Sequence, residues 1–76
     1  METVNVDFNN TDSSGRIRLN TVGALESIRK KSIDLIEGKQ VELDDEDGLR
    51  NTGILKFSKE EYIWVAEIEC GKFIYY

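Results

Sequence analysis

The chain has 76 residues, 39% of them hydrophobic and 33% charged, which fits one globular domain with a small core. Its net charge of −5 disfavours nucleic acid and anionic membrane as partners. A single cysteine excludes an internal disulfide, and no apolar run reaches the length of a membrane span. No signal peptide is visible at the N-terminus. We therefore expect a single cytoplasmic domain over residues 1–76.

Two strands are predicted in the N-terminal part of the chain. Apolar and polar residues alternate over residues 4–8, as in a half-buried strand. Residues 9–15 are turn formers, whose Asn, Asp and Ser side chains bond locally to backbone. Residues 16–20 alternate again and direct Arg16 and Arg18 outward. We expect the two strands to pair as an N-terminal hairpin.

A short helix is predicted next. Asn20 or Thr21 can cap its first turn. Val22, Leu25 and Ile28 then repeat at helical spacing, which predicts that these three side chains face the core.

The end of this helix is open to two interpretations. The apolar stripe can be prolonged to Gly38. We favour a shorter helix that ends near Lys31, because Ile33 lies off the stripe, whereas Ile33 and Leu35 alternate as in an extended segment. A turn at residues 37–38 then follows.

The second half of the chain is predicted to consist of strands. Residues 40–44 alternate, residues 44–48 form an acidic turn, and residues 72–76 form a short final strand. Residues 53–70 are typical of a β-hairpin, since two runs of β-branched and aromatic residues flank a polar break at residues 58–61. About five short strands and one helix predict a mainly β fold (α+β), a strongly bent sheet or small barrel.

The register of the central hairpin defines two faces. A symmetric turn places Phe57 opposite Tyr62. Leu55 then lies opposite Trp64. The uncharged face, which we assign to the core, carries Leu55, Phe57, Tyr62, Trp64, Ala66, Ile68 and Cys70. The opposite face carries Ile54, Lys56, Ile63, Val65, Glu67 and Glu69.

Several short strings resemble one protein family. They are the string at residues 15–23, the pattern Leu35-x-Glu37-Gly38-x-x-Val41-x-Leu43-x-Asp45, and Gly53, Phe57, Trp64, Val65, Ala66 and Ile68. Over about two thirds of the chain this pattern resembles a group of small bacterial SH3-like barrel proteins. The resemblance implies an SH3-like barrel and brings no established activity. That group has a second tryptophan in its final strand, whereas this chain has Glu69, Cys70 and Gly71 at the corresponding place.

Residue types that carry common catalytic chemistry are scarce. The chain has no histidine and one cysteine, which removes His-based nucleophile pairs and the usual zinc ligands. The acidic turn lacks EF-hand spacing, because Leu43 and Ile54 would both have to be acidic. Glu60 and Glu61 lie on an exposed turn, which offers no sheltered cleft for acid–base catalysis. We expect no catalytic residue, no metal and no cofactor.

Arg16 and Arg18 are the first candidate for partner binding. They project from one strand face and form a basic spot with residues 29–31 if the strand and the helix abut. Arginine binds acidic groups in a bidentate manner, so the spot suits an acidic peptide or a phosphate. The alternative, which we favour, is that these residues pair with carboxylates of the same chain.

Ile54, Ile63 and Val65 are the second candidate. The expected register places Ile54 opposite Val65, on the face of the hairpin that is nominally exposed. Three apolar side chains there are either covered by the helix, which we favour, or form a docking patch.

Together these features predict a non-enzymatic protein-interaction module with a protein partner of unknown identity, either a monomer or a weak homodimer. One alternative is a nucleic-acid-binding small barrel, whose binding would depend steeply on salt. The other is a carboxylate-based metal-binding protein or small enzyme, for which calorimetry with Ca²⁺ or Mg²⁺ is the test.

Overall fold

The computed structural model describes residues 2–68 and 74–75 and confirms a mainly β fold with one short helix. Its elements are β1 (Thr3–Asn5), β2 (Ile17–Arg18), α1 (Val22–Lys30), β3 (Gln40–Asp44), β4 (Leu49–Ser58), β5 (Ile63–Ile68) and β6 (Ile74–Tyr75). β6 falls within the predicted final strand, whereas Glu69 and Cys70 lie outside the described residues. No helix in the described part of the chain is both long and apolar enough to span a membrane.

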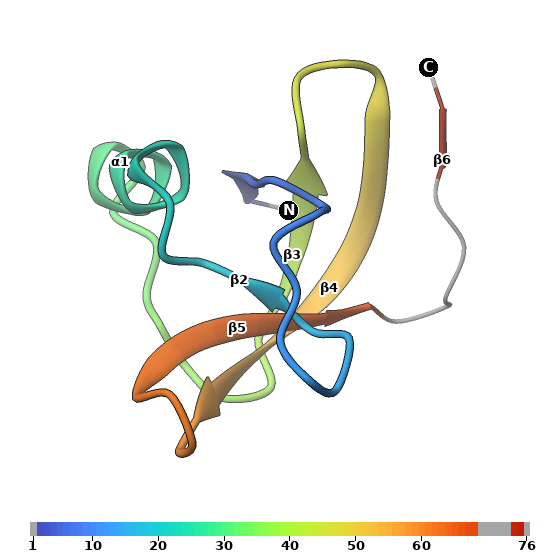
Figure 1. Ribbon diagram of the computed structural model, residues 1–76. Coiled ribbons are helices and arrows are strands. Elements are labelled where there is room, and N and C mark those ends of the chain that lie inside the picture. The colour runs from blue at the N-terminus through green and yellow to red at the C-terminus, as the bar shows by residue number, and fades with distance from the viewer. Residues whose placement is uncertain (1, 69–73, 76) are drawn as a thin grey trace.

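One bent sheet contains all of these strands. The strand order is β1-β3-β4-β5-β2, and β6 pairs with the beginning of β4. β4 runs through both halves of the sheet, because residues 50–54 pair with β3 and residues 53–58 pair with β5. Figure 1 shows β4 curving strongly along its length, so that the sheet wraps around the core as a half-barrel.

Gly53 lies where β4 passes from one half of the sheet to the other. It pairs with Val41 on β3 and with Ile68 on β5. A Cβ atom at this position would lie 2.7 Å from Cδ1 of Leu43 and 3.1 Å from Cβ of Ala66. The sheet can therefore close over Leu43 only because residue 53 has no side chain.

The core lies inside the curve of the sheet and receives side chains from the helix and from most strands. Its buried apolar residues are Val4, Val6, Ile17, Leu19, Ala24, Ile33, Val41, Leu43, Leu55 and Ala66. Phe8, Ile28, Trp64 and Ile68 pack against it while remaining partly exposed.

The predicted N-terminal hairpin is wrong. β1 pairs in parallel with β3, where Val4 lies beside Leu43, and β2 pairs with β5. One isolated bridge, between Thr11 and Ile17, joins the loop to β2. A two-stranded hairpin on its own is only marginally stable in water. Joining β1 to β3 and β2 to β5 instead buries Val4 and Ile17 almost completely.

The central hairpin forms, but its register differs by two residues from the predicted one. Phe57 pairs with Trp64, and Leu55 pairs with Ala66. Tyr62 belongs to the loop instead of the core face: it has a φ of 57° and is 80% exposed. A shift of two residues keeps side chains on their predicted faces.

Local hydrogen bonds explain the longer loop. The Tyr62 backbone N–H donates to the Ser58 carbonyl at 2.8 Å, and the Glu61 N–H donates to the Ser58 hydroxyl at 3.3 Å. The four residues 59–62 thus close the turn around Ser58, which is buried.

The helix has the predicted bounds. Its N-cap is Thr21, whose hydroxyl accepts a hydrogen bond from the Ala24 N–H at 3.1 Å. It ends at Lys30, as the shorter of the two interpretations requires, and residues 37–38 form the predicted turn.

The helix faces differ in part from the predicted ones, because Ile28 packs against the core as predicted whereas Val22 and Leu25 do not. Ala24 and Ser27 are buried, whereas Val22 and Leu25 are 74% and 54% exposed. The small side chains let α1 approach β1 closely, and the Ser27 hydroxyl accepts a hydrogen bond from the Asn5 N–H at 3.1 Å. This contact fixes the rotation of the helix and turns part of its apolar stripe outward.

Candidate functional site

Large apolar side chains gather on the surface around the helix and the central hairpin. Those more than a third exposed are Val22, Leu25, Leu35, Ile36 and Tyr62. They come from α1, from the loop between α1 and β3, and from the β4–β5 loop. Single exposed apolar residues are ordinary, but a group of them around one hollow marks a candidate interaction surface.

That hollow is a groove of about 250 Å³, which we call the apolar groove. Its lining consists of Leu19, Asn20, Leu25, Ile28, Leu35, Ile63 and Trp64. Asn20 is the one amide side chain among these residues, and the other six residues are aliphatic or aromatic. Small-molecule sites commonly have about 300–1,000 Å³ and several convergent polar groups. The size and lining of this groove therefore favour apolar side chains of another protein.

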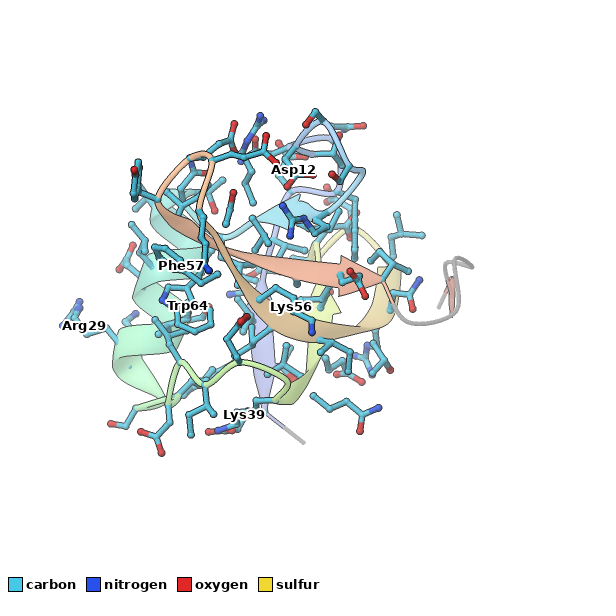
Figure 2. All side chains as sticks on the ribbon, turned by 90° about the horizontal axis from the view of Figure 1, so that it is seen from below. Asp12, Arg29, Lys39, Lys56, Phe57 and Trp64 are labelled. Atoms are coloured by element: carbon cyan, nitrogen blue, oxygen red, sulfur yellow. The ribbon has the colours of Figure 1, made fainter. Side chains whose placement is uncertain are left out.

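Trp64 forms one wall of the apolar groove. Its ring meets that of Phe57 edge to face, with centroids 5.6 Å apart and an interplanar angle of 72°. In the view of Figure 2 both side chains overlap α1, and Trp64 lines the groove together with Leu25 and Ile28 of that helix. Because Trp64 also packs on the core, the shape of the groove depends on the fold of the central hairpin.

A polar network holds one rim of the groove. Arg18 on β2 donates from Nε and Nη2 to the two carboxylate oxygens of Glu61, both at 2.8 Å. Its Nη1 also reaches Asn10 at 3.3 Å, and the Asn10 side chain donates to that of Asn20 at 2.9 Å. The hydrogen bond from Arg18 lowers the pKa of Glu61 and raises the pKa of Arg18 itself. This network ties the β4–β5 loop to β2.

The two arginines of the predicted basic spot are paired with carboxylates of the same chain. Arg18 is paired with Glu61, and Nε of Arg16 lies 2.9 Å from Asp12. Of the other predicted members, Lys30 lies 4.0 Å from Glu26. The two arginines therefore stabilise loops, which is the alternative that the sequence favours.

Asp12 is a buried carboxylate at the centre of the loop between β1 and β2. Burial opposes its ionisation. Hydrogen bonds from the Arg16 and Ser14 backbone N–H groups and from Arg16 Nε, each 2.9 Å, outweigh burial and lower the pKa of Asp12. Asp12 thus closes the loop and fixes Arg16.

The predicted docking patch of Ile54, Ile63 and Val65 does not exist as one exposed surface. Val65 is 0% exposed, because β5 lies between β4 and β2 and the long side chains of Lys56 and Arg18 flank it. Ile54 is half-buried and lies opposite Glu67 instead of Val65. Ile63 is half-buried and lines the apolar groove. Of the three, Ile63 is the one that the structure places at a candidate site.

The acidic turn satisfies its own backbone. Asp44 accepts a hydrogen bond from the Glu46 N–H, and Asp45 accepts from the N–H groups of Asp47 and Leu49, over 2.8–3.0 Å. Within residues 2–68 and 74–75, no three carboxylates or other ligand side chains are arranged to hold a metal ion.

The sequence interpretation missed Leu25 and Leu35 as surface residues and missed the surface role of Trp64. The sequence did carry a signal for the helix. Ala24 and Ser27 are small residues three positions apart, a spacing that puts them on one helix face and permits close packing there. Assigning that face to the core would have turned Leu25 outward.

Comparison with known proteins adds no relative. No family model matches the chain, and no curated protein or solved structure is detectably similar to it. The resemblance to SH3-like barrel proteins therefore stays a prediction, and function has to be argued from the geometry of the groove.

Proposed function

We propose that this protein is a non-enzymatic interaction module that binds another protein through the apolar groove. The observation that carries the proposal is the apolar groove itself, with exposed apolar side chains on the elements around it. Leu25 and Leu35 line the groove and are also exposed. Removing such side chains from water against a partner is favourable by about 25 cal/mol per Å² of apolar surface, before the entropic cost of association is subtracted.

Binding through side chains fits the molecule better than addition of a strand to the sheet. The outer edge of β1 is occupied, because the Asn5 N–H donates to Ser27 and Nζ of Lys31 donates to the Thr3 carbonyl at 2.8 Å. The outer edge of β2 is occupied by the preceding loop, where the Arg18 N–H donates to the Asn10 carbonyl. Partners that add a strand need an open edge.

The predicted SH3-like architecture belongs to the same proposal. It is supported by the strongly bent sheet, in which β4 takes part in both halves. The proposal does not rest on it, because function is carried by the site and not by the fold.

Capture from a host lysate tests this function. The immobilised wild type is compared with Leu25→Glu and Leu35→Glu, which each place one carboxylate in the groove. Ser13→Glu, on the exposed loop between β1 and β2, is the matched control for added charge. We expect the wild type and the control to capture the same protein and both leucine variants to lose it. If all four capture the same set, the groove is not the binding surface.

A further inference from the structure

A short segment between α1 and β3 is held to the domain less firmly than the elements around it. It comprises residues 34–37, which we call the strap, and it forms neither helix nor strand. Figure 1 shows it within the connection that leaves α1 and leads to β3. All four residues are exposed, and their backbone N–H groups donate to no residue that the structure describes. A stretch with few buried contacts and an unbonded backbone is the kind that opens locally in a folded protein.

Both ends of the strap are anchored to the domain. Before it, Ile33 is buried in the core, and its N–H donates to the Ile28 carbonyl at 3.0 Å. After it, the Gly38 N–H donates to the Leu55 carbonyl, and the Leu55 N–H donates to the Lys39 carbonyl, both at 2.8 Å. Motion of the strap is therefore confined to the residues between these two anchors.

One side chain of the strap is hydrogen-bonded to the sheet. Continuing the pairing of β3 with β4 by three residues would bring Glu37 opposite Phe57. The main-chain pairing does not continue that far, because the Lys39 N–H turns back to the Ile36 carbonyl at 3.1 Å. The Phe57 N–H donates instead to a carboxylate oxygen of Glu37, at 3.1 Å. A flexible side chain thus holds this edge of β4 where a regular ladder would supply a main-chain carbonyl.

The strap also supplies a wall of the apolar groove. Leu35 lines the groove together with Trp64, although Leu35 is 37% exposed. Other walls of the groove come from α1 and β5. Movement of the strap would carry Leu35 away from Trp64 and widen the groove, while α1 and β5 stay in place.

We propose that the strap is a lid of the apolar groove, which opens and closes without unfolding of the domain, and that the hydrogen bond between Glu37 and Phe57 is its latch. Opening breaks this bond and leaves the anchors on both sides in place. The bond is exposed, so water can replace either partner, and the net contribution of such a bond to stability is modest. The inference goes beyond the proposed function, because opening needs no partner.

Amide hydrogen exchange tests this motion. The Phe57 N–H reports on the latch, because Glu37 is its acceptor, and the Leu55 N–H on the same edge of β4 reports on the anchor. We expect Phe57 to be less protected than Leu55 in the wild type. Exchange at Phe57 should also be insensitive to low concentrations of urea, because local opening exposes little surface. Exchange at Leu55 requires a larger unfolding event and should accelerate with urea.

Glu37→Ala removes the latch. We expect this variant to accelerate exchange at Phe57 about tenfold, the equivalent of one hydrogen bond, and to leave Leu55 and the melting temperature unchanged. Glu37→Gln keeps an oxygen acceptor and should restore most of the protection. Asp34→Ala is the matched control, because Asp34 is an exposed acid of the strap that makes no hydrogen bond or ion pair with any described residue.

Quenching of Trp64 fluorescence by acrylamide tests whether the strap covers the groove. The signal is specific, since Trp64 is the only tryptophan of the chain. We expect stronger quenching in Glu37→Ala than in the wild type or in Asp34→Ala.

Equal protection and equal urea dependence at Phe57 and Leu55 would overturn the inference, because the strap would then open only when the domain unfolds. Glu37→Ala would overturn it as well by accelerating both amides alike or neither of them. Faster exchange at Phe57 with unchanged quenching of Trp64 would show a strap that moves without uncovering the groove, which also contradicts a lid. None of these measurements requires a partner, so their failure is distinct from a failure of the capture experiment.

Discussion

Phe57 and Trp64 face each other across β4 and β5, with ring centroids 5.6 Å apart. The two residues are also direct partners in the register of the central hairpin, so their ring contact supports that register. It also joins the core to the surface, since Trp64 packs on the buried cluster and lines the apolar groove. Folding and binding therefore depend on the same side chain.

Replacing Trp64 with Ala should remove most of the stability of the domain. Truncation of a packed tryptophan costs about 3–5 kcal/mol. A domain of this size has only about 3–5 kcal/mol available. Urea unfolding followed by circular dichroism measures the loss, with Trp64→Phe as the control that keeps an aromatic ring against Phe57. A Trp64→Ala protein with a well-dispersed amide spectrum and an unchanged midpoint would show that Trp64 is not needed for the core.

Val65→Lys should unfold the domain. Val65 is 0% exposed, so the substitution places an ammonium group without a partner in a buried position. A cost of about 3 kcal/mol lowers the melting temperature of a domain this small by about 12–24 °C. The control is Glu67→Lys, an exposed position on the same face of β5, for which a change within about ±0.5 kcal/mol is expected. Equal melting temperatures for the two variants would show that Val65 is accessible.

Gly53→Ala should destabilise the bend in β4. The added Cβ would meet the buried Leu43 at 2.7 Å, and overpacking of this kind costs about 1–3 kcal/mol. Gly23→Ala is the matched control, because nothing lies within 4 Å of its Cβ position in α1. There alanine should stabilise the helix by about 0.5–1 kcal/mol. Thermal melts should show a lower melting temperature for Gly53→Ala and a higher one for Gly23→Ala. Changes in melting temperature of the same sign would contradict the described packing at Gly53.

The loop around Asp12 should make stability depend on pH. The pKa of Asp12 is lowered in the folded protein, so its ionised form contributes stability above the unfolded value of about 3.9. That contribution is lost as the pH falls through the folded pKa. We expect wild type to melt above Asp12→Asn at pH 7 and the difference to shrink below about pH 3.9.

Asp34→Asn removes the same charge from an exposed position and serves as the control for this titration. Its melting temperature should follow that of the wild type throughout. A wild-type advantage over Asp12→Asn that does not change with pH would mean that the Asp12 charge is not what closes the loop.

The strands of the second half of the chain could be predicted because apolar and polar residues alternate along them, and a register error of two residues leaves each side chain on the same face. Leu55 and Ala66 lie on the predicted core face although the register shifts by two residues. The shift itself could not be predicted, because it depends on Tyr62 adopting a φ of 57°. Residues other than glycine seldom adopt a positive φ. The polar residues 58–61 are flanked by an aromatic residue on each side, so the sequence does not show that Tyr62 belongs to the loop.

The pairing of the first strands and the rotation of the helix depend on contacts between distant parts of the chain. Val4 pairs with a strand almost forty positions further on, next to Leu43. The helix is rotated by a hydrogen bond from Asn5 to Ser27. Helical periodicity identifies an apolar stripe but does not show which side of the helix is buried, so it predicts Leu25 in the core. The apolar groove follows from that rotation, so the sequence pattern does not predict it.

Chemical-shift mapping tests the central claim most directly, because Trp64 is the only tryptophan in the chain and its indole N–H is a single resolved probe. Labelled protein is titrated with unlabelled copies of itself and, separately, with each protein recovered by capture. We expect the Trp64 indole and the amides of Leu25 and Leu35 to shift together with increasing partner. Shifts concentrated at residues 44–48, with the Trp64 indole unmoved at saturation, would contradict the assignment of the groove as the binding surface.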